Sequence, residues 1–224
     1  MFTTEHCGLF ITVEGPDGSG KSTQVRILGE RLQREGYRVL LSREPGGTPI
    51  GMKIRGILLD PANQDLTAIA EMLLMFAARA QNVEQWILPA LADGRIVLSD
   101  RFTDSSLVYQ GAGRGLGAQV VRQVDRIACK GLVPDLTIVV DIDTETGLAR
   151  AHARNRDGSG PKESRLDEQA LEFHRKARAA YHQLAIDETD RVKIVDGDAP
   201  QGVVADRIWE ILGPCLLVQG AKPA

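Results

Sequence analysis

The segment that most constrains the fold of this chain lies near its start, where a short apolar run meets a glycine-rich loop. Residues Leu9–Glu14 read LFITVE and favour a buried strand, and residues 15–22 read GPDGSGKS. The loop fits G-x-x-x-x-G-K-[ST], whose backbone N–H groups and lysine bind polyphosphate. Helical spacing begins at Lys21, so the motif lies between a strand and a helix, as it requires. A chance glycine-rich turn is the alternative, and this context disfavours it.

Apolar segments and segments with helical spacing alternate along the rest of the chain. Further strands are predicted over 38–42, 95–100, 136–141 and 192–196, and helices over 21–34, 66–91, 119–130, 144–154, 166–186 and 202–212. This alternation is typical of an α/β fold, with a parallel sheet covered by helices on both faces. We therefore predict a single domain over residues 1–224, built on a five-stranded parallel sheet.

The carboxyl ends of the predicted strands carry the polar residues. Ligands of parallel sheets bind beyond these ends. The glycine-rich loop follows the first strand, the segment REPGGT (43–48) follows the second, and Asp100 and Arg101 end the third. An aspartate there can hold a Mg²⁺-bound water and an arginine can clamp phosphate. A surface ion pair is the alternative for these two residues.

Composition excludes several other classes. The formal net charge is −3, which argues against a protein that coats nucleic acid. The sequence contains no run of about 18 apolar residues, so no membrane span is predicted. The three cysteines are widely spaced and odd in number, which favours reduced thiols. We expect a cytoplasmic protein without a nucleic-acid or membrane partner.

The glycine-rich loop assigns a donor site for ATP and Mg²⁺. Lys21 should reach the β- and γ-phosphates, and the Ser22 hydroxyl should bind Mg²⁺, with Asp100 nearby. Asp17 is unexpected, since it places a carboxylate beside a polyphosphate site. The residues expected to contribute to ATP binding are Gly15, Pro16, Asp17, Gly18, Ser19, Gly20, Lys21, Ser22 and Thr23.

Two further groups of residues have both a functional and a structural interpretation. Arg79 interrupts an apolar helical stripe, with Phe76 one turn earlier, so the pair could stack a base and bond its edge. Pattern alone favours a core Phe76 and an Arg79 that extends to solvent. Arg154, Arg156 and Arg165 flank the loop 157–161, as in a lid over phosphates, or as in an ordinary basic surface loop.

Taken together, these segments resemble the thymidylate kinase family. The resemblance is carried by VEGPDGSGKST (13–23), SREPGGT (42–48), Phe76 with Arg79, SDRFTDSSLVYQGAGRG (99–115), VPDLTIVVDID (133–143) and SRLDEQALEFHRKARAAY (164–181). It implies a P-loop nucleoside monophosphate kinase fold with a short lid over about 154–165. The implied activity is phosphorylation of dTMP to dTDP by ATP and Mg²⁺, a step of dTTP biosynthesis. A homodimer is also implied, with the helix 66–91 as a candidate surface.

The resemblance implies a role for each residue of the acceptor site. Phe76 would stack on thymine, and Arg79 would bond a thymine oxygen. Ser105 or Ser106, with Gln110, would complete the base pocket, and Tyr109 would exclude a ribose 2′-hydroxyl. Arg43 and Arg101 would hold the dTMP phosphate, beside Pro45 after a cis peptide bond.

The resemblance also gives Asp17 a role, at the 3′-hydroxyl of the acceptor and near its arginines. Gly18 stands where some members of the family place a P-loop arginine, so the chain resembles the bacterial class whose lid supplies this charge. The catalytic set implied is Lys21, Arg101, Arg154, Arg165 and Asp17, with Arg156 as the alternate. Which lid arginine contacts phosphate stays open.

Two other functions remain as alternatives at this point. Another P-loop nucleotide or small-molecule kinase would share the donor site and bind a different acceptor. A regulatory nucleotide switch would hold or hydrolyse nucleotide without an acceptor.

Overall fold

The centre of the protein is a five-stranded parallel sheet, in a computed structural model that describes residues 7–156 and 165–218, with side chains over 7–154 and 165–216. Its neighbouring strands are all parallel, in the order β2-β3-β1-β4-β5. The predicted fold class is therefore confirmed. The strands are β1 (Leu9–Glu14), β2 (Val39–Arg43), β3 (Ile96–Asp100), β4 (Leu136–Asp141) and β5 (Val192–Asp196).

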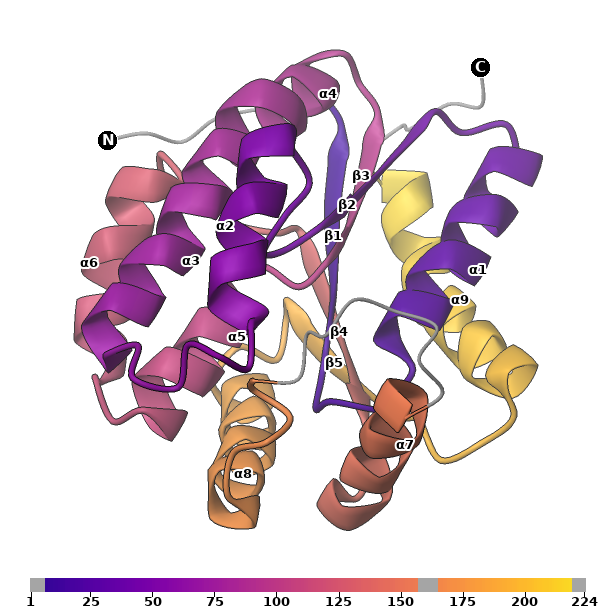
Figure 1. Ribbon diagram of the computed structural model, residues 1–224. Coiled ribbons are helices and arrows are strands. Elements are labelled where there is room, and N and C mark those ends of the chain that lie inside the picture. Colours follow the sequence, from indigo (N-terminus) through magenta and orange to yellow (C-terminus); the bar gives the residue numbers. More distant parts are fainter. Residues whose placement is uncertain (1–6, 157–164, 219–224) are drawn as a thin grey trace.

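Helices cover both faces of the sheet, because both sides of its strands are apolar. In β1, Leu9, Ile11 and Val13 pack in one core cluster with α1 (Lys21–Arg34) and α9 (Gln201–Val218). Phe10 points the other way, into a cluster with α3 (Ala68–Asn82) and α6 (Ala118–Ala128). Figure 1 shows α1 and α9 together on one side of the sheet, with α2, α3 and α6 on the other. This arrangement follows from the two-residue period of strand side chains.

The long helix predicted over 66–91 is three helical segments. After α3 comes a π-helical turn, η1 (Val83–Ile87), and then α4 (Leu88–Ala92). Pro89, in the first turn of α4, has no N–H to bond the carbonyl four residues earlier. A widened turn before this proline keeps the chain helical, which apolar periodicity alone does not reveal.

Other element boundaries also differ from the predictions. Helix α2 (Pro49–Leu59) was not predicted, although Thr48 caps it by accepting from the Gly51 N–H at 2.9 Å, with Pro49 next. Neither α5 (Thr103–Ser106) nor the π-helical η2 (Leu107–Gly113) was predicted. Helix α7 is Thr144–Arg156, α8 (Leu171–Asp187) begins later than expected, and α9 continues through Pro214 to Val218.

The register of the sheet brings the chemically important strand ends together. Val13 and Arg43 are both paired with Asp100, so the ends of β1, β2 and β3 lie side by side. Of the helices described, none has the length and apolar character needed to cross a bilayer.

Candidate active site

A cavity of about 880 Å³ opens at the carboxyl edge of the sheet, and most of the predicted site residues line it. Its walls come from the glycine-rich loop, the ends of β2 and β3, and helices α3, η2 and α7. The predicted residues that line it are Asp17, Gly18, Gly20, Lys21, Ser22, Thr23, Arg43, Pro45, Arg79, Asp100, Arg101, Ser105, Ser106, Tyr109, Gln110 and Arg154. Those outside its lining are Gly15, Pro16, Ser19, Phe76 and Arg165.

The glycine-rich loop follows β1 and positions Lys21 at the start of α1. The Lys21 ammonium is buried and donates to the Pro16 carbonyl at 2.7 Å. Burial and the nearby charge of Arg101 lower the pKa of Lys21 to about 8. The lysine remains predominantly protonated at neutral pH and can bind phosphate oxygens.

Gly18 lies against the backbone of α7, which explains why no side chain is present there. An added Cβ would lie 1.9 Å from the Gly147 carbonyl oxygen, and the φ of Gly18 is +75°. A Cβ on Gly147 would in turn meet the Asp17 carbonyl at 2.5 Å. The loop therefore cannot carry an arginine at this position, while the contact holds α7 beside the phosphate site.

Ser22 and Asp100 meet at the mouth of the loop, with the serine Oγ 2.5 Å from the Asp100 Oδ2. A hydroxyl and a carboxylate are hard oxygen donors of the kind that Mg²⁺ prefers, and Mg²⁺ sites often keep few protein ligands. Within residues 7–154 and 165–216 no cluster of three or more acidic, histidine or cysteine side chains could hold a metal. The pair thus fits a Mg²⁺ that is mainly coordinated by phosphates and water.

Asp17 pairs with Arg101 in the middle of the cavity. Its Oδ1 lies 2.6 Å from the Arg101 Nη2, and its Oδ2 accepts from the Tyr109 hydroxyl at 3.1 Å. Burial opposes ionisation of this carboxyl, but the charges of Arg101 and Lys21 hold its pKa below the usual value. Asp17 is therefore an anion with two cations beside it.

The backbone of Arg101 is left-handed, with φ of 72°, a rare conformation for a residue with a side chain. Three hydrogen bonds hold it. The Arg101 N–H donates to the Val13 carbonyl at 3.0 Å, Ser99 Oγ donates to the Arg101 carbonyl at 2.8 Å, and the Phe102 N–H donates to Glu14 at 2.7 Å. This conformation turns the guanidinium from the end of β3 toward Asp17.

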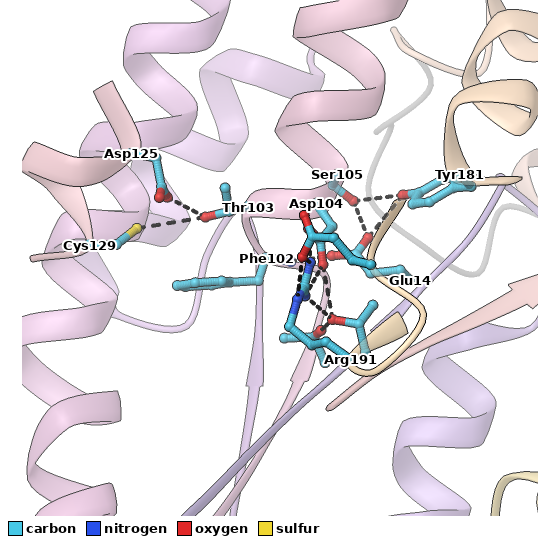
Figure 2. Close-up of polar contacts among 12 residues, drawn as sticks. Glu14, Phe102, Thr103, Asp104, Ser105, Asp125, Cys129, Tyr181 and Arg191 are labelled. Atoms are coloured by element: carbon cyan, nitrogen blue, oxygen red, sulfur yellow. Dashed lines mark hydrogen bonds and ion pairs between the residues drawn. The ribbon is translucent and has the colours of Figure 1, made fainter. Parts of the chain in front are cut away.

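Glu14 is the fully buried carboxyl behind Arg101. Ser105 and Tyr181 donate their hydroxyls to its Oε2 at 2.5 and 2.9 Å (Figure 2). The same two hydroxyl oxygens accept from the Arg101 Nη1 at 2.9 and 3.1 Å. Burial and the nearby Asp104 raise the pKa of Glu14 to about 7. Glu14 therefore supports both the backbone and the side chain of Arg101.

The structure places Phe76 in the core, and its neighbour Met75 at the cavity. Phe76 is 2% exposed within the cluster of Phe10, and the Arg79 guanidinium lies 4.6 Å from its ring centroid. Arg79 does reach the cavity, bonded to the Glu44 carboxylate and to the Phe102 carbonyl at 3.0 Å. The ring is covered by its neighbours, and the stacking of Phe76 on a base stays a prediction.

The end of β2 contributes Arg43 and Pro45. Arg43 is exposed at the cavity and contacts the Met52 sulfur at 3.4 Å. The Glu44–Pro45 peptide bond is cis, as the family resemblance implied. Ser106, buried on α5, also lines the cavity, as does Gln110.

The arginines of the predicted lid have different environments. Arg154, near the end of α7, lines the cavity, has a 62% exposed side chain and lies 3.5 Å from Asp167. Arg165 is 1% exposed, so its side chain is buried. It donates to Glu71 at 2.7 Å and to the Leu58 carbonyl. The side chain of Arg156 and residues 157–164 lie outside the described residues.

The structure adds several cavity residues that sequence reasoning missed, among them Arg150 and Met75. Arg150 lies one helical turn before Arg154, lines the cavity and pairs with Asp198 at 3.0 Å. The i,i+4 spacing of the two arginines was the available signal. Met75 had no comparable signal, because neighbouring apolar residues on a helix cannot be assigned to core or cavity by pattern alone.

The sheet order, the phosphate-binding loop after its central strand and the adjoining charged cavity define the class of protein, a P-loop kinase of the nucleoside monophosphate kinase type. A sequence model of the thymidylate kinase family matches residues 13–208. The chain belongs to the thymidylate kinase family.

Individual relatives agree with this family. The thymidylate kinase of Pelobacter propionicus is 49% identical over 201 residues, which cover 90% of this chain and 92% of the relative. That of Halothermothrix orenii is 49% identical over 210 residues, covering 94% and 99%. Among solved structures, thymidylate kinase from Ehrlichia chaffeensis superposes with a TM-score of 0.72 at 28% identity, covering 92% of this chain and 98% of that one.

Proposed function

We propose that the cavity binds ATP and dTMP at adjoining subsites, with Mg²⁺ on the ATP side, and transfers the γ-phosphoryl group in line to the dTMP phosphate. As a member of its family the chain is a thymidylate kinase, which forms dTDP from dTMP and ATP in dTTP biosynthesis. The observation that carries the site assignment is the pairing of Asp17 with Arg101. It joins the phosphate-binding loop to the residues of the acceptor side within one cavity.

On the donor side, the loop from Gly15 to Thr23 would surround the ATP phosphates, with Lys21 on the β- and γ-oxygens. Ser22 and Asp100 would hold Mg²⁺ directly or through its water. When bound, Mg²⁺ neutralises charge on the β- and γ-phosphates.

On the acceptor side, Arg43 and Arg101 would hold the dTMP phosphate, and Asp17 would accept from its 3′-hydroxyl. Arg101 then serves two anions, the carboxylate and the phosphate, from its fixed left-handed position. The thymine would lie toward Arg79, Gln110 and Ser105 or Ser106, with Met75 as an apolar wall. Tyr109 would lie against the sugar.

Positive charge beside the transferred phosphoryl group would come from arginines of α7 instead of from the phosphate-binding loop. Gly18 has no room for a side chain, and Arg154 and Arg150 extend from the helix that packs on it. The attacking phosphate oxygen is already ionised at neutral pH, so positioning and charge neutralisation account for catalysis without a strong general base.

Homodimer formation and a cytoplasmic location are part of the same proposal. Ile69 and Leu73 on α3 are 56% and 51% exposed, and Trp86 on η1 is 44% exposed, so this surface presents large apolar groups for a second copy. None of the three cysteines, all within the described residues, forms a disulfide. Light scattering at micromolar concentration tests the dimer, and a monomer with α3 accessible to solvent would refute it.

The experiment that tests the function follows ³¹P signals of ATP, ADP, dTMP and dTDP with the purified protein. We expect stoichiometric dTDP and ADP, formed only with dTMP and a divalent ion present. Lys21→Ala should nearly abolish turnover with the fold intact, because Lys21 acts on charge at the β- and γ-oxygens. ATP hydrolysis that needs no acceptor would instead indicate a nucleotide switch, and transfer to another acceptor would indicate a different kinase.

A further inference from the structure

Glu71, on α3, is a fully buried carboxylate that accepts hydrogen bonds from three side chains beside the cavity. The Gln110 Nε2 donates to its Oε1 at 3.0 Å. Arg114 donates to both oxygens, from Nε at 3.2 Å and Nη2 at 2.9 Å. Arg165 donates to Oε2 at 2.7 Å. Gln110 is the member of this group that lines the cavity.

Glu71 acts on Gln110 as an acceptor only, because it is ionised. Burial alone would raise the pKa of Glu71, but hydrogen bonds from Arg114, Gln110 and Arg165 lower it below its usual value. An ionised carboxylate has no proton to donate. Gln110 must therefore present its amide nitrogen to Glu71, and the flipped amide would place two acceptors against each other.

The amide oxygen of Gln110 then faces away from Glu71. In the described part of the chain no donor bonds this oxygen, and Gln110 lines the cavity together with Arg79. The side chain is 1% exposed, so it has little freedom to present its other edge. The cavity thus meets a ligand here with a fixed hydrogen-bond acceptor.

A fixed acceptor distinguishes pyrimidine bases by their N3 position. Thymine and uracil carry a hydrogen on N3, whereas neutral cytosine has a lone pair there. An acceptor facing N3 bonds the first two and repels the third, and a mismatched buried polar group is costly.

We propose that Glu71 is a positioning residue that sets the base specificity of the acceptor site by fixing the orientation of the Gln110 amide. This proposal rests on the proposed function, in which Gln110 contacts the base. Glu71 touches no substrate and acts through Gln110. Arg114 and Arg165 keep it ionised, which gives the buried Arg165 a role within the fold.

The test compares Glu71→Gln with the wild type on dTMP, dCMP and dUMP. A glutamine at 71 can donate as well as accept, so the Gln110 amide is free to flip. The ratio of kcat/KM for dTMP over dCMP should fall at least about tenfold, as expected for one charged hydrogen bond. The ratio for dTMP over dUMP should stay within about twofold, because both bases carry N3–H.

Arg114→Met is the matched control variant. It removes another partner of Glu71 but leaves the bond between Glu71 and Gln110 in place, and the buried Arg165 still pairs with Glu71 and keeps it ionised. We expect a lower melting temperature with an unchanged dTMP over dCMP ratio. An unchanged dTMP over dCMP ratio in Glu71→Gln, a parallel loss of both ratios, or an equal loss in Arg114→Met would overturn the proposal.

If Glu71→Gln does not fold, a measurement on the wild type tests the same proposal. The side-chain amide signals of Gln110, assigned by their loss in Gln110→Met, should stay hydrogen-bonded and shift little when dTMP binds. A large shift or rapid solvent exchange on binding would show that the amide nitrogen faces the base and would refute the role of Glu71. A wild type without preference for dTMP over dCMP would refute the base pocket itself.

Discussion

The Asp17 carboxylate and the Arg101 guanidinium are 2.6 Å apart, one from the phosphate-binding loop and the other from the end of β3. This pair explains how a negative charge is tolerated inside a polyphosphate site. Arg101 and Lys21 hold the pKa of Asp17 below its usual value despite burial, so the carboxylate is compensated before any ligand binds.

Asp17→Asn should impair the acceptor side more than the donor side. We expect kcat/KM for dTMP to fall about 10- to 100-fold, the range for one charged hydrogen bond. Steady-state kinetics with either substrate varied measure this. Tyr109→Phe, which removes the 3.1 Å bond to Asp17 and the 3.3 Å bond from Arg101 but keeps the Asp17–Arg101 pair, should cost less. An increase confined to the KM for ATP would contradict the assignment of Asp17 to the acceptor.

Gly18→Ala should destabilise the protein more than Gly20→Ala. Both glycines have positive φ, but an added Cβ at Gly20 meets nothing within 4 Å, whereas at Gly18 it meets the Gly147 carbonyl. Backbone strain alone should cost Gly20→Ala roughly 1–2 kcal/mol of unfolding free energy. Overpacking at Gly18 adds about 1–3 kcal/mol. Equal losses in urea unfolding would show that α7 is not held against the loop.

The three arginines around α7 should separate into catalytic and structural effects. Arg154→Met and Arg150→Met should lower kcat by on the order of 10–10³ with little change in the KM for dTMP, because their contacts strengthen in the transition state. Arg165→Met breaks a buried ion pair and should cost about 3–5 kcal/mol of stability. An unchanged melting temperature with a reduced kcat in Arg165→Met would instead indicate a catalytic role for this arginine.

Glu14 predicts a pH dependence of stability. Its pKa rises from 4.5 to about 7 on folding, so the folded state binds more protons between these values, and unfolding free energy falls as pH rises through this window. Glu14→Gln removes this titrating carboxyl group. The stability of the wild type relative to Glu14→Gln should therefore decline between pH 5 and 8, by on the order of 3 kcal/mol. A constant or rising difference would exclude a raised pKa.

The sheet could be predicted from sequence because each strand is a short apolar run, and both faces of β1 are buried. The helix boundaries were less predictable. The π-turn before Pro89 and the helical continuation through Pro214 run against the usual tendency of proline to end or kink a helix.

The site was predictable where a residue ends a strand or directly follows it, as Asp100 and Arg101 do. It was less predictable on helices, where adjacent residues point about 100° apart and Met75, not Phe76, reaches the cavity. Arg165 follows the segment 157–164, but its burial against Glu71 depends on a contact with a distant helix.

The choice of acceptor at this cavity is best measured as kcat/KM for ADP formation with dTMP, dUMP, dCMP, dGMP and ribo-TMP. The cavity, with Arg79, Gln110 and Tyr109, predicts that dTMP exceeds dCMP and dGMP by at least about 10²-fold and exceeds ribo-TMP clearly. Comparable values for dTMP and dCMP, or ADP formation that is independent of the acceptor, would rule out a thymine-selective acceptor site in this cavity.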